Sequence, residues 1–144
     1  MINLIEIGSK AKQSAKMLAV TSTAQRNAVL EEIAALLLEH RDRILEANAK
    51  DIANARQKGL NEAMIDRLMI TPQRLEGMAT DVRRVIELPD PLGEVFDEQI
   101  LPNGLKVYKQ RVPLGVLGVI YESRPNVTVD VSGLALKSGN AVIL

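Results

Sequence analysis

The residues best suited to chemistry in this sequence lie in one short segment, 121–126, which contains Ser123, Arg124 and Asn126. The segment follows a continuous apolar run, 115–121, which is typical of a strand buried on both faces of a parallel sheet. The carboxyl ends of such strands and the free amides of helix starts bind anions and nucleotides in α/β folds. We therefore predict a binding site here, with simple capping of the following helix as the alternative.

Neither of two familiar phosphate-binding motifs explains this segment. Gly115 and Gly118 fall inside the predicted strand, whereas the dinucleotide fingerprint needs its glycines in the turn before the helix. The stretch 137–140 lacks the upstream glycine pattern of a P-loop. The site must therefore be understood from its polar side chains.

The remaining candidates for catalysis are weak. His40 is the single histidine and stands at the end of a helical stretch, so no local Ser-His-Asp triad can form. With no cysteine, these residues offer neither a thiolate nucleophile nor a thiolate metal site, and we predict no metal ligand set. The acidic residues are spaced as solvated helix faces, and Lys137 suits the last turn of a helix.

Composition excludes several classes of protein. The 18 basic and 18 acidic side chains balance, which argues against non-specific nucleic-acid binding and a polybasic membrane anchor. Three aromatic residues offer little for base stacking. No apolar run approaches the length of a membrane span and no signal peptide is visible, so we predict a soluble, cytoplasmic protein.

The first 88 or so residues are predicted to be helical. Ser22 with Gln25 fits a capping box, Asn61 could cap a short helix, and Thr71 followed by Pro72 marks another start. A helix over 41–56 is expected to end at Gly59. The apolar faces are predicted from spacing as Val29, Ile33, Leu36 and Leu37, then Leu45, Ala49 and Ile52, then Leu75, Met78, Val82 and Ile86.

A turn-rich stretch, 89–93, separates these helices from two strand candidates, 94–101 and 105–112. Asn103-Gly104 between them predicts a hairpin, since both residues tolerate positive φ. Polar residues on both faces suggest an exposed ribbon with free edges.

The last third predicts a strand, a crossover helix and a second strand. A start at Pro125 and a stop at Gly139 favour a helix with Val127, Val131 and Leu134 on one face, although the alternating valines also suit a strand. A second apolar strand begins at residue 141, which completes a βαβ unit. Two parallel strands leave open sheet edges, so we expect this chain to be an N-terminal piece of a longer protein.

Four stretches, 44–51, 59–68, 112–130 and 134–144, closely resemble the gamma-glutamyl phosphate reductase (glutamate-5-semialdehyde dehydrogenase) family of the aldehyde dehydrogenase superfamily. The Arg-Pro-Asn-Val-Thr segment beginning at Arg124 is the most specific. The resemblance implies an α/β fold with a helical lead-in over 1–93, a hairpin oligomerisation arm over 94–112, and the truncated first βαβ of a Rossmann-like NADP-binding domain over 113–144.

The resemblance also implies a reaction and its participants. Family members use NADPH to reduce gamma-glutamyl phosphate to glutamate 5-semialdehyde in proline biosynthesis, through a cysteine thiolate. That cysteine belongs to a later region, so this piece alone is expected to be inactive. The implied partners are the small-molecule substrate, a second copy of the chain through the hairpin, and glutamate 5-kinase, without nucleic acid or membrane.

By resemblance, the side-chain amide of Asn126 is the oxyanion donor of the reaction. The residues before it, Tyr121, Glu122, Ser123 and Pro125, correspond to the cofactor cleft, largely through backbone contacts. We infer for Arg124 a contact with the acyl phosphate or the substrate carboxylate, which a guanidinium binds in bidentate fashion.

Two alternatives remain open. The chain could be a non-catalytic module that associates with a partner through its hairpin or sheet edge. It could also belong to another member of the aldehyde dehydrogenase superfamily that acts on a different acyl or aldehyde substrate.

Overall fold

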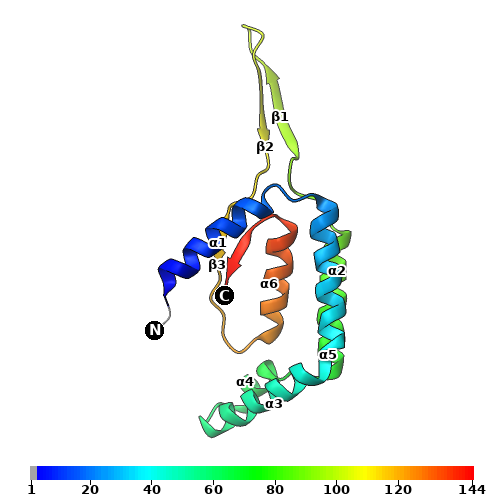
Figure 1. Ribbon diagram of the computed structural model, residues 1–144, viewed down its shortest axis with the longest axis vertical. Coiled ribbons are helices and arrows are strands. Elements are labelled where there is room, and N and C mark those ends of the chain that lie inside the picture. The colour runs from blue at the N-terminus through cyan, green and yellow to red at the C-terminus, as the bar shows by residue number, and fades with distance from the viewer. Residues whose placement is uncertain (1–2) are drawn as a thin grey trace.

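The computed structural model describes residues 3–144, in which helices precede a hairpin and a βαβ unit. The elements are α1 (Leu4–Leu18), α2 (Thr23–Glu39), α3 (Arg41–Gln57), α4 (Glu62–Leu68), α5 (Pro72–Glu87), β1 (Val95–Ile100), β2 (Lys106–Gln110), β3 (Val116–Gly118), α6 (Pro125–Lys137) and β4 (Ala141–Ile143). The hairpin projects from one end of the molecule and α3 with α4 form the other end (Figure 1).

The predicted helix starts are confirmed by their hydrogen bonds. Ser22 and Gln25 form a reciprocal capping box at α2. The side chains of Asn61 and Thr71 accept from the backbone N–H three residues later, at 2.9 Å and 3.1 Å, and so begin α4 and α5. Gly59, at φ +77°, ends α3 as expected.

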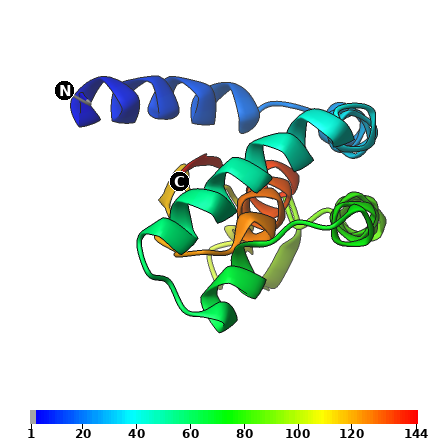
Figure 2. The same ribbon diagram turned by 90° about the horizontal axis from the view of Figure 1, so that it is seen from below.

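The core lies where α2 and α5 run side by side and α6 packs against both (Figure 2). Leu30 and Ala34 of α2 and Ala79 and Val82 of α5 are buried together, with half-buried apolar side chains around them. The predicted face of α5 is confirmed, since Leu75, Met78 and Val82 are buried.

The predicted faces of α2 and α6 are partly wrong. Val29 is 48% exposed and Leu134 is 51% exposed, whereas the buried α6 positions include Gly133 and Ala135. A Cβ on Gly133 would stand 3.8 Å from Cδ2 of Leu30. The buried positions of α6 thus include small residues, so the largest apolar side chains did not mark the contact.

The βαβ unit is present, but its first strand differs from expectation. β3 and β4 pair in parallel, with Val116 opposite Ala141, and α1 contacts both strands. β3 spans three residues rather than seven, and its side chains are exposed or half-buried instead of covered on both faces. Within residues 3–144, β4 is the single strand that pairs with β3, so one edge of β3 stays open.

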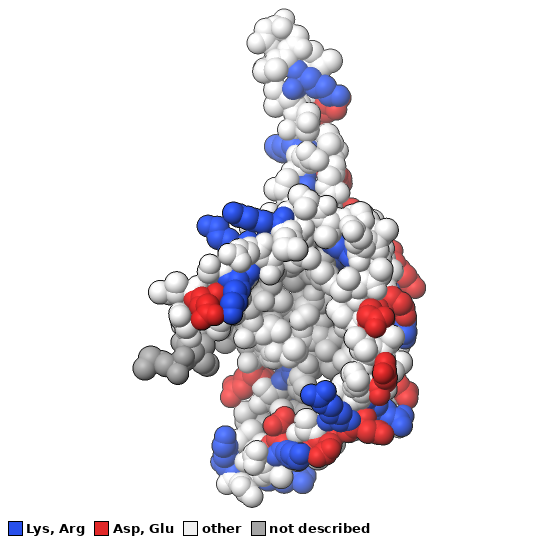
Figure 3. Space-filling view, viewed as in Figure 1, with Lys and Arg blue, Asp and Glu red and all other residues white. Residues whose placement is uncertain are grey.

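The hairpin is an exposed antiparallel ribbon, as predicted. Every residue of β1 and β2 is exposed, and charged groups of both signs lie along the ribbon (Figure 3). Of the two turn residues, Gly104 alone takes a positive φ, +83°, while Asn103 accepts through Oδ1 from the N–H of Leu105 at 3.1 Å. Asp97, at φ +54°, lies in a bulge between the strands.

Gly139 connects the end of α6 to the neighbouring segments. Its φ is +70°, and an added Cβ would lie 2.8 Å from Cδ1 of Leu92 and 3.1 Å from Cγ of Pro113. Both the backbone conformation and the space therefore require glycine.

We expect Gly139→Ala to lower the free energy of unfolding by about 2–4 kcal/mol, combining left-handed strain with overpacking. Urea unfolding followed by circular dichroism measures this loss. Gly59→Ala is the matched control, because Gly59 has φ +77° but no heavy atom within 4 Å of an added Cβ. Its cost should be about 1–2 kcal/mol; equal costs for the two variants would show that the contacts of Gly139 do not matter.

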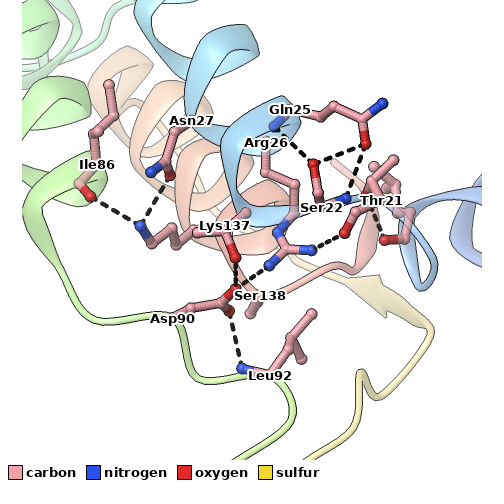
Figure 4. A network of polar contacts seen from close by, with 12 residues as sticks. Thr21, Ser22, Gln25, Arg26, Asn27, Ile86, Asp90, Leu92, Lys137 and Ser138 are labelled. Carbon is pink, nitrogen blue, oxygen red and sulfur yellow. Dashed lines mark hydrogen bonds and ion pairs between the residues drawn. The ribbon is translucent and has the colours of Figure 1, made fainter.

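Two buried cations stabilise the junction between α2, the segment after α5 and the end of α6 (Figure 4). The guanidinium of Arg26 donates to the carboxylate of Asp90 and to the backbone carbonyl of Thr21. The ammonium of Lys137 donates to Oδ1 of Asn27 and to the carbonyl of Ile86, both at 2.9 Å.

The prediction that Lys137 lies in the last turn of α6 is confirmed. The structure adds that its side chain is buried, at 3% exposure. Its two acceptors come from α2 and from the end of α5, so the side chain links three helices. The spacing of residues in α6 could not reveal partners more than 50 residues away.

The carboxylate of Asp90 is ionised at a lower pH than usual. Burial by itself would raise its pKa, but hydrogen bonds from Thr23 and the N–H of Leu92, with the charges of Arg26 and Lys137, outweigh burial and hold the pKa below 3.8. Because the pKa is lower in the folded than in the unfolded protein, the ionised carboxylate of Asp90 stabilises the fold above pH 3.8. This stabilisation is lost as the pH falls through the pKa of Asp90 in the folded protein.

The free energy of unfolding should therefore fall more steeply with decreasing pH in the wild type than in Asp90→Asn, between about pH 5 and pH 2. Urea titrations at several pH values measure both slopes. Parallel slopes would contradict the low pKa of Asp90. Asp51→Asn, on an exposed position of α3, is the control and should leave the wild-type slope unchanged.

Among the helices of residues 3–144, none combines the length and the apolar character needed to cross a membrane.

Candidate functional site

A groove of about 430 Å³ lies between α4, α5 and the start of α6. Charged groups of both signs and apolar side chains line it together. The lining residues are Asp66, Arg67, Met69, Ile70, Arg74, Gly77, Met78, Asp81, Arg124, Pro125 and Asn126.

Three of the predicted site residues, Arg124, Pro125 and Asn126, line this groove together. Arg124 occupies the N-cap position of α6, and Pro125 is the first helical residue. No side chain caps this helix end. The alternative that these residues merely cap the helix therefore lacks its hydrogen bond. Pro125 has no N–H and the N–H of Val127 donates to the carbonyl of Arg124 at 3.0 Å, so the backbone N–H of Asn126 is the donor that this helix end offers to an anion.

The other three predicted residues, Tyr121, Glu122 and Ser123, lie in the loop between β3 and α6 and are not part of the groove wall. The hydroxyl groups of Tyr121 and Thr128 form a hydrogen bond that fastens the loop to the first turns of α6. Ser123 has φ +51°, an uncommon conformation for a residue other than glycine. The chain therefore bends sharply before it presents Arg124 and Asn126.

The arginines of the groove differ in whether neighbouring groups already bind their guanidinium groups. Arg74 donates to the carbonyl of Met69 at 2.9 Å and to the carboxylate of Asp66 at 3.0 Å, so it joins α4 to α5. The ion pairs among residues 3–144 include neither Arg67 nor Arg124. These two guanidinium groups are suited to bind a carboxylate or phosphate.

The amide of Asn126 faces a carboxylate on its own helix. Its Nδ2 donates to Oδ2 of Asp130 at 3.2 Å, one turn further along α6. Burial raises the pKa of Asp130, the hydrogen bond from Asn126 opposes this, and the charge of Asp81 on α5 adds to the increase, so that the pKa stands above 3.8.

Sequence reasoning missed the residues that α4 and α5 bring to this site. Asp81 is among the acidic residues predicted to lie on solvated helix faces, and the sequence by itself predicts no role for Arg67 or Arg74. No local signal distinguishes these three residues. Asp130 was detectable in principle, because a spacing of four residues places it beside Asn126 on a helix.

The arrangement can bind an anionic group and donate a hydrogen bond to a developing negative charge, but it holds no cysteine nucleophile. In the described range 3–144, no group of three or more His, Cys, Asp or Glu side chains is placed to hold a metal ion.

The chain matches the family model described as "Aldehyde dehydrogenase family" over residues 4–144. It is 56% identical to a gamma-glutamyl phosphate reductase of Chloroflexus aggregans over all of this chain and 34% of that protein. It is 57% identical to the enzyme of the same name from Roseiflexus castenholzii, with the same coverage. A relative of that name from Escherichia coli is 56% identical over 98% of this chain and 34% of its own length.

Comparison with solved structures gives the same family as the sequence comparisons. A gamma-glutamyl phosphate reductase from Thermotoga maritima superposes with a TM-score of 0.94 at 42% identity, over 98% of this chain and 34% of that one. A Saccharomyces cerevisiae structure of the same name gives a TM-score of 0.91 at 36% identity, over 96% of this chain and 35% of that one. The chain spans about a third of the length of these relatives. The chain belongs to the aldehyde dehydrogenase family, and its sequence and fold are similar to the N-terminal third of gamma-glutamyl phosphate reductases.

Proposed function

We propose that this chain is the N-terminal third of an NADPH-dependent reductase that converts gamma-glutamyl phosphate to glutamate 5-semialdehyde in proline biosynthesis. The observation that carries the proposal is the identity of 55–57% with relatives of that name over the whole chain. The placement of Arg124 and Asn126 in one groove supports it. The chain contains no cysteine and is expected to be inactive alone.

In the proposed reaction, a cysteine thiolate supplied by the rest of the protein attacks the acyl carbon, and the bond to phosphate breaks. The resulting thioester accepts a hydride, and the thiolate leaves to give the aldehyde. Each step places negative charge on the acyl oxygen. The amide of Asn126 donates a hydrogen bond to that oxygen, because it lies at the start of α6 with one N–H not used by Asp130.

The substrate carries a phosphate and a carboxylate, and the groove offers cations for both. Arg124 stands two residues before Asn126, and Arg67 faces the same groove from α4. Among residues 3–144, neither Arg124 nor Arg67 forms an ion pair. We infer that Arg124 contacts the phosphate or the carboxylate of the substrate.

A nicotinamide cofactor fits the loop that follows β3, and when bound it would supply the hydride. Tyr121, Glu122, Ser123 and Pro125 would line its cleft largely through their backbone groups. The side chain of the neighbouring Ile120 is fully exposed, at 102%, and so offers an apolar surface to such a group. Preference for NADPH over NADH belongs to the proposal.

The hairpin is proposed to join copies of the protein. Its exposed side chains include Ile100, Leu105 and Tyr108, which are at least half exposed, and its strand edges are unpaired. Sedimentation of the full-length protein should give a mass that is a multiple of the single-chain mass. We further propose a cytoplasmic location and action alongside glutamate 5-kinase; co-sedimentation with that kinase tests the second.

The reverse reaction tests the proposed function in the full-length protein that carries this chain. We expect reduction of NADP⁺ by glutamate 5-semialdehyde that requires inorganic phosphate, because phosphate must release the acyl group from the thioester. Phosphate-independent oxidation of simple aldehydes would instead identify another aldehyde dehydrogenase. Absence of both NADPH binding and activity would favour a non-catalytic module.

A further inference from the structure

Asp130 on α6 has a single polar partner within residues 3–144, the amide of Asn126. The distance from Nδ2 of Asn126 to Oδ2 of Asp130 is 3.2 Å. Asp130 takes part in none of the ion pairs of the described chain. Ion pairing therefore does not explain a half-buried carboxylate at this position.

The surroundings of Asp130 disfavour its charge. It lines a cavity of about 340 Å³ between α5 and α6, together with apolar side chains such as Val82, Val85 and Val129. The charged group that faces it there is another carboxylate, Asp81. A carboxylate held in such a place without a cation lowers the stability of the fold. The contact with Asn126 is therefore the main interaction that this carboxylate provides.

The chemistry of the contact fixes the amide in one orientation. An ionised carboxylate accepts hydrogen bonds but cannot donate them, so Nδ2 of Asn126 must face Asp130 and Oδ1 must face away. Rotating the amide by half a turn would place its oxygen against the carboxylate. One N–H is thereby used, and the second is held in a defined direction at the start of α6.

We propose that Asp130 is a positioning residue that orients the side-chain amide of Asn126 for donation to the acyl oxygen of the substrate. This role rests on the proposed function, and it extends the site by one helical turn. Asp130 acts through Asn126 and touches no reacting atom.

The test measures steady-state kinetics of the full-length protein in the phosphate-dependent reverse reaction. We expect Asp130→Ala to lower kcat about tenfold with KM unchanged, because the amide loses its fixed orientation. Asp130→Asn keeps an acceptor oxygen but can also donate through its own Nδ2, so it fixes the amide of Asn126 only in part and should lower kcat by less than Asp130→Ala, about threefold. Ser132→Ala removes a hydrogen bond to the carbonyl of Thr128 on the same helix and serves as the control, with wild-type kinetics.

The decisive comparison is a double-mutant cycle. In an Asn126→Ala background, Asp130→Ala should change kcat no further, because there is no amide left to orient. An equal loss in that background would mean a general structural role and would overturn the proposal. Wild-type kcat in Asp130→Ala, or a rise in KM alone, would overturn it too. A wild-type protein without phosphate-dependent activity overturns the proposed function itself, and with it this role.

Discussion

Replacing Asn126 with alanine should lower kcat of the full-length protein by about two orders of magnitude, since removal of one oxyanion donor costs on the order of 3 kcal/mol of transition-state stabilisation. The amide stands at the start of α6, where the helix dipole adds to the positive potential. The same groove holds Arg124, so a substrate anchored by the arginine would have its acyl group near the amide.

The measurement is the kcat of purified Asn126→Ala in the phosphate-dependent reaction, with thermal unfolding to establish that the variant is folded. Asn126 is exposed, and its side-chain bond is to Asp130 one turn away, so little loss of stability is expected. Ser132→Ala on the same helix is again the control. Wild-type turnover in Asn126→Ala would remove this residue from the site.

The second large effect is expected at Arg26, where replacement with methionine should lower the free energy of unfolding by about 2–3 kcal/mol. The side chain of Arg26 is 4% exposed and that of Asp90 is 21% exposed. Breaking a fully buried pair costs about 3–5 kcal/mol, and the partial exposure of Asp90 reduces this because water can solvate the remaining carboxylate. The carbonyl of Thr21 also loses its donor.

Urea unfolding of Arg26→Met, Asp90→Asn and the double variant measures the coupling between the two side chains. The double variant should lose less stability than the sum of the single variants. The control is Arg83→Met, which breaks an exposed pair between α5 and α2, with side chains 41% and 53% exposed. Its cost should stay below about 1 kcal/mol; a cost equal to that of Arg26→Met would show that burial does not set the strength of the pair.

Local signals in the sequence were sufficient for the starts of α2, α4, α5 and α6, and for the order in which helices, hairpin and βαβ unit follow one another. Ser22, Asn61 and Thr71 cap helices through backbone amides three residues away, so neighbouring residues determine these ends. Gly104 permits the hairpin turn for a similarly local reason. The segment ending at Asn126 was recognisable because polar residues stand between an apolar run, 115–121, and a helix start marked by Pro125.

Only the tertiary structure decided which faces pack and which charges are buried. Gly133 and Ala135 are the buried positions of α6 beside Lys137, and Gly133 faces Leu30 of α2; which positions face a neighbouring helix follows from packing rather than from hydrophobic spacing. Lys137 finds its acceptors on α2 and at the end of α5, because the fold brings together segments that are 51 and 110 residues apart.

The same reasoning applies to the site. The sequence by itself determined that Arg124 and Asn126 stand at the start of α6, since both lie within one strand-to-helix connection. The tertiary structure added Arg67 and Asp81, which α4 and α5 carry to the same groove. Hydrogen bonds within one turn of chain leave a pattern in the sequence, whereas contacts between distant helices depend on how the helices pack, and no short segment encodes that packing.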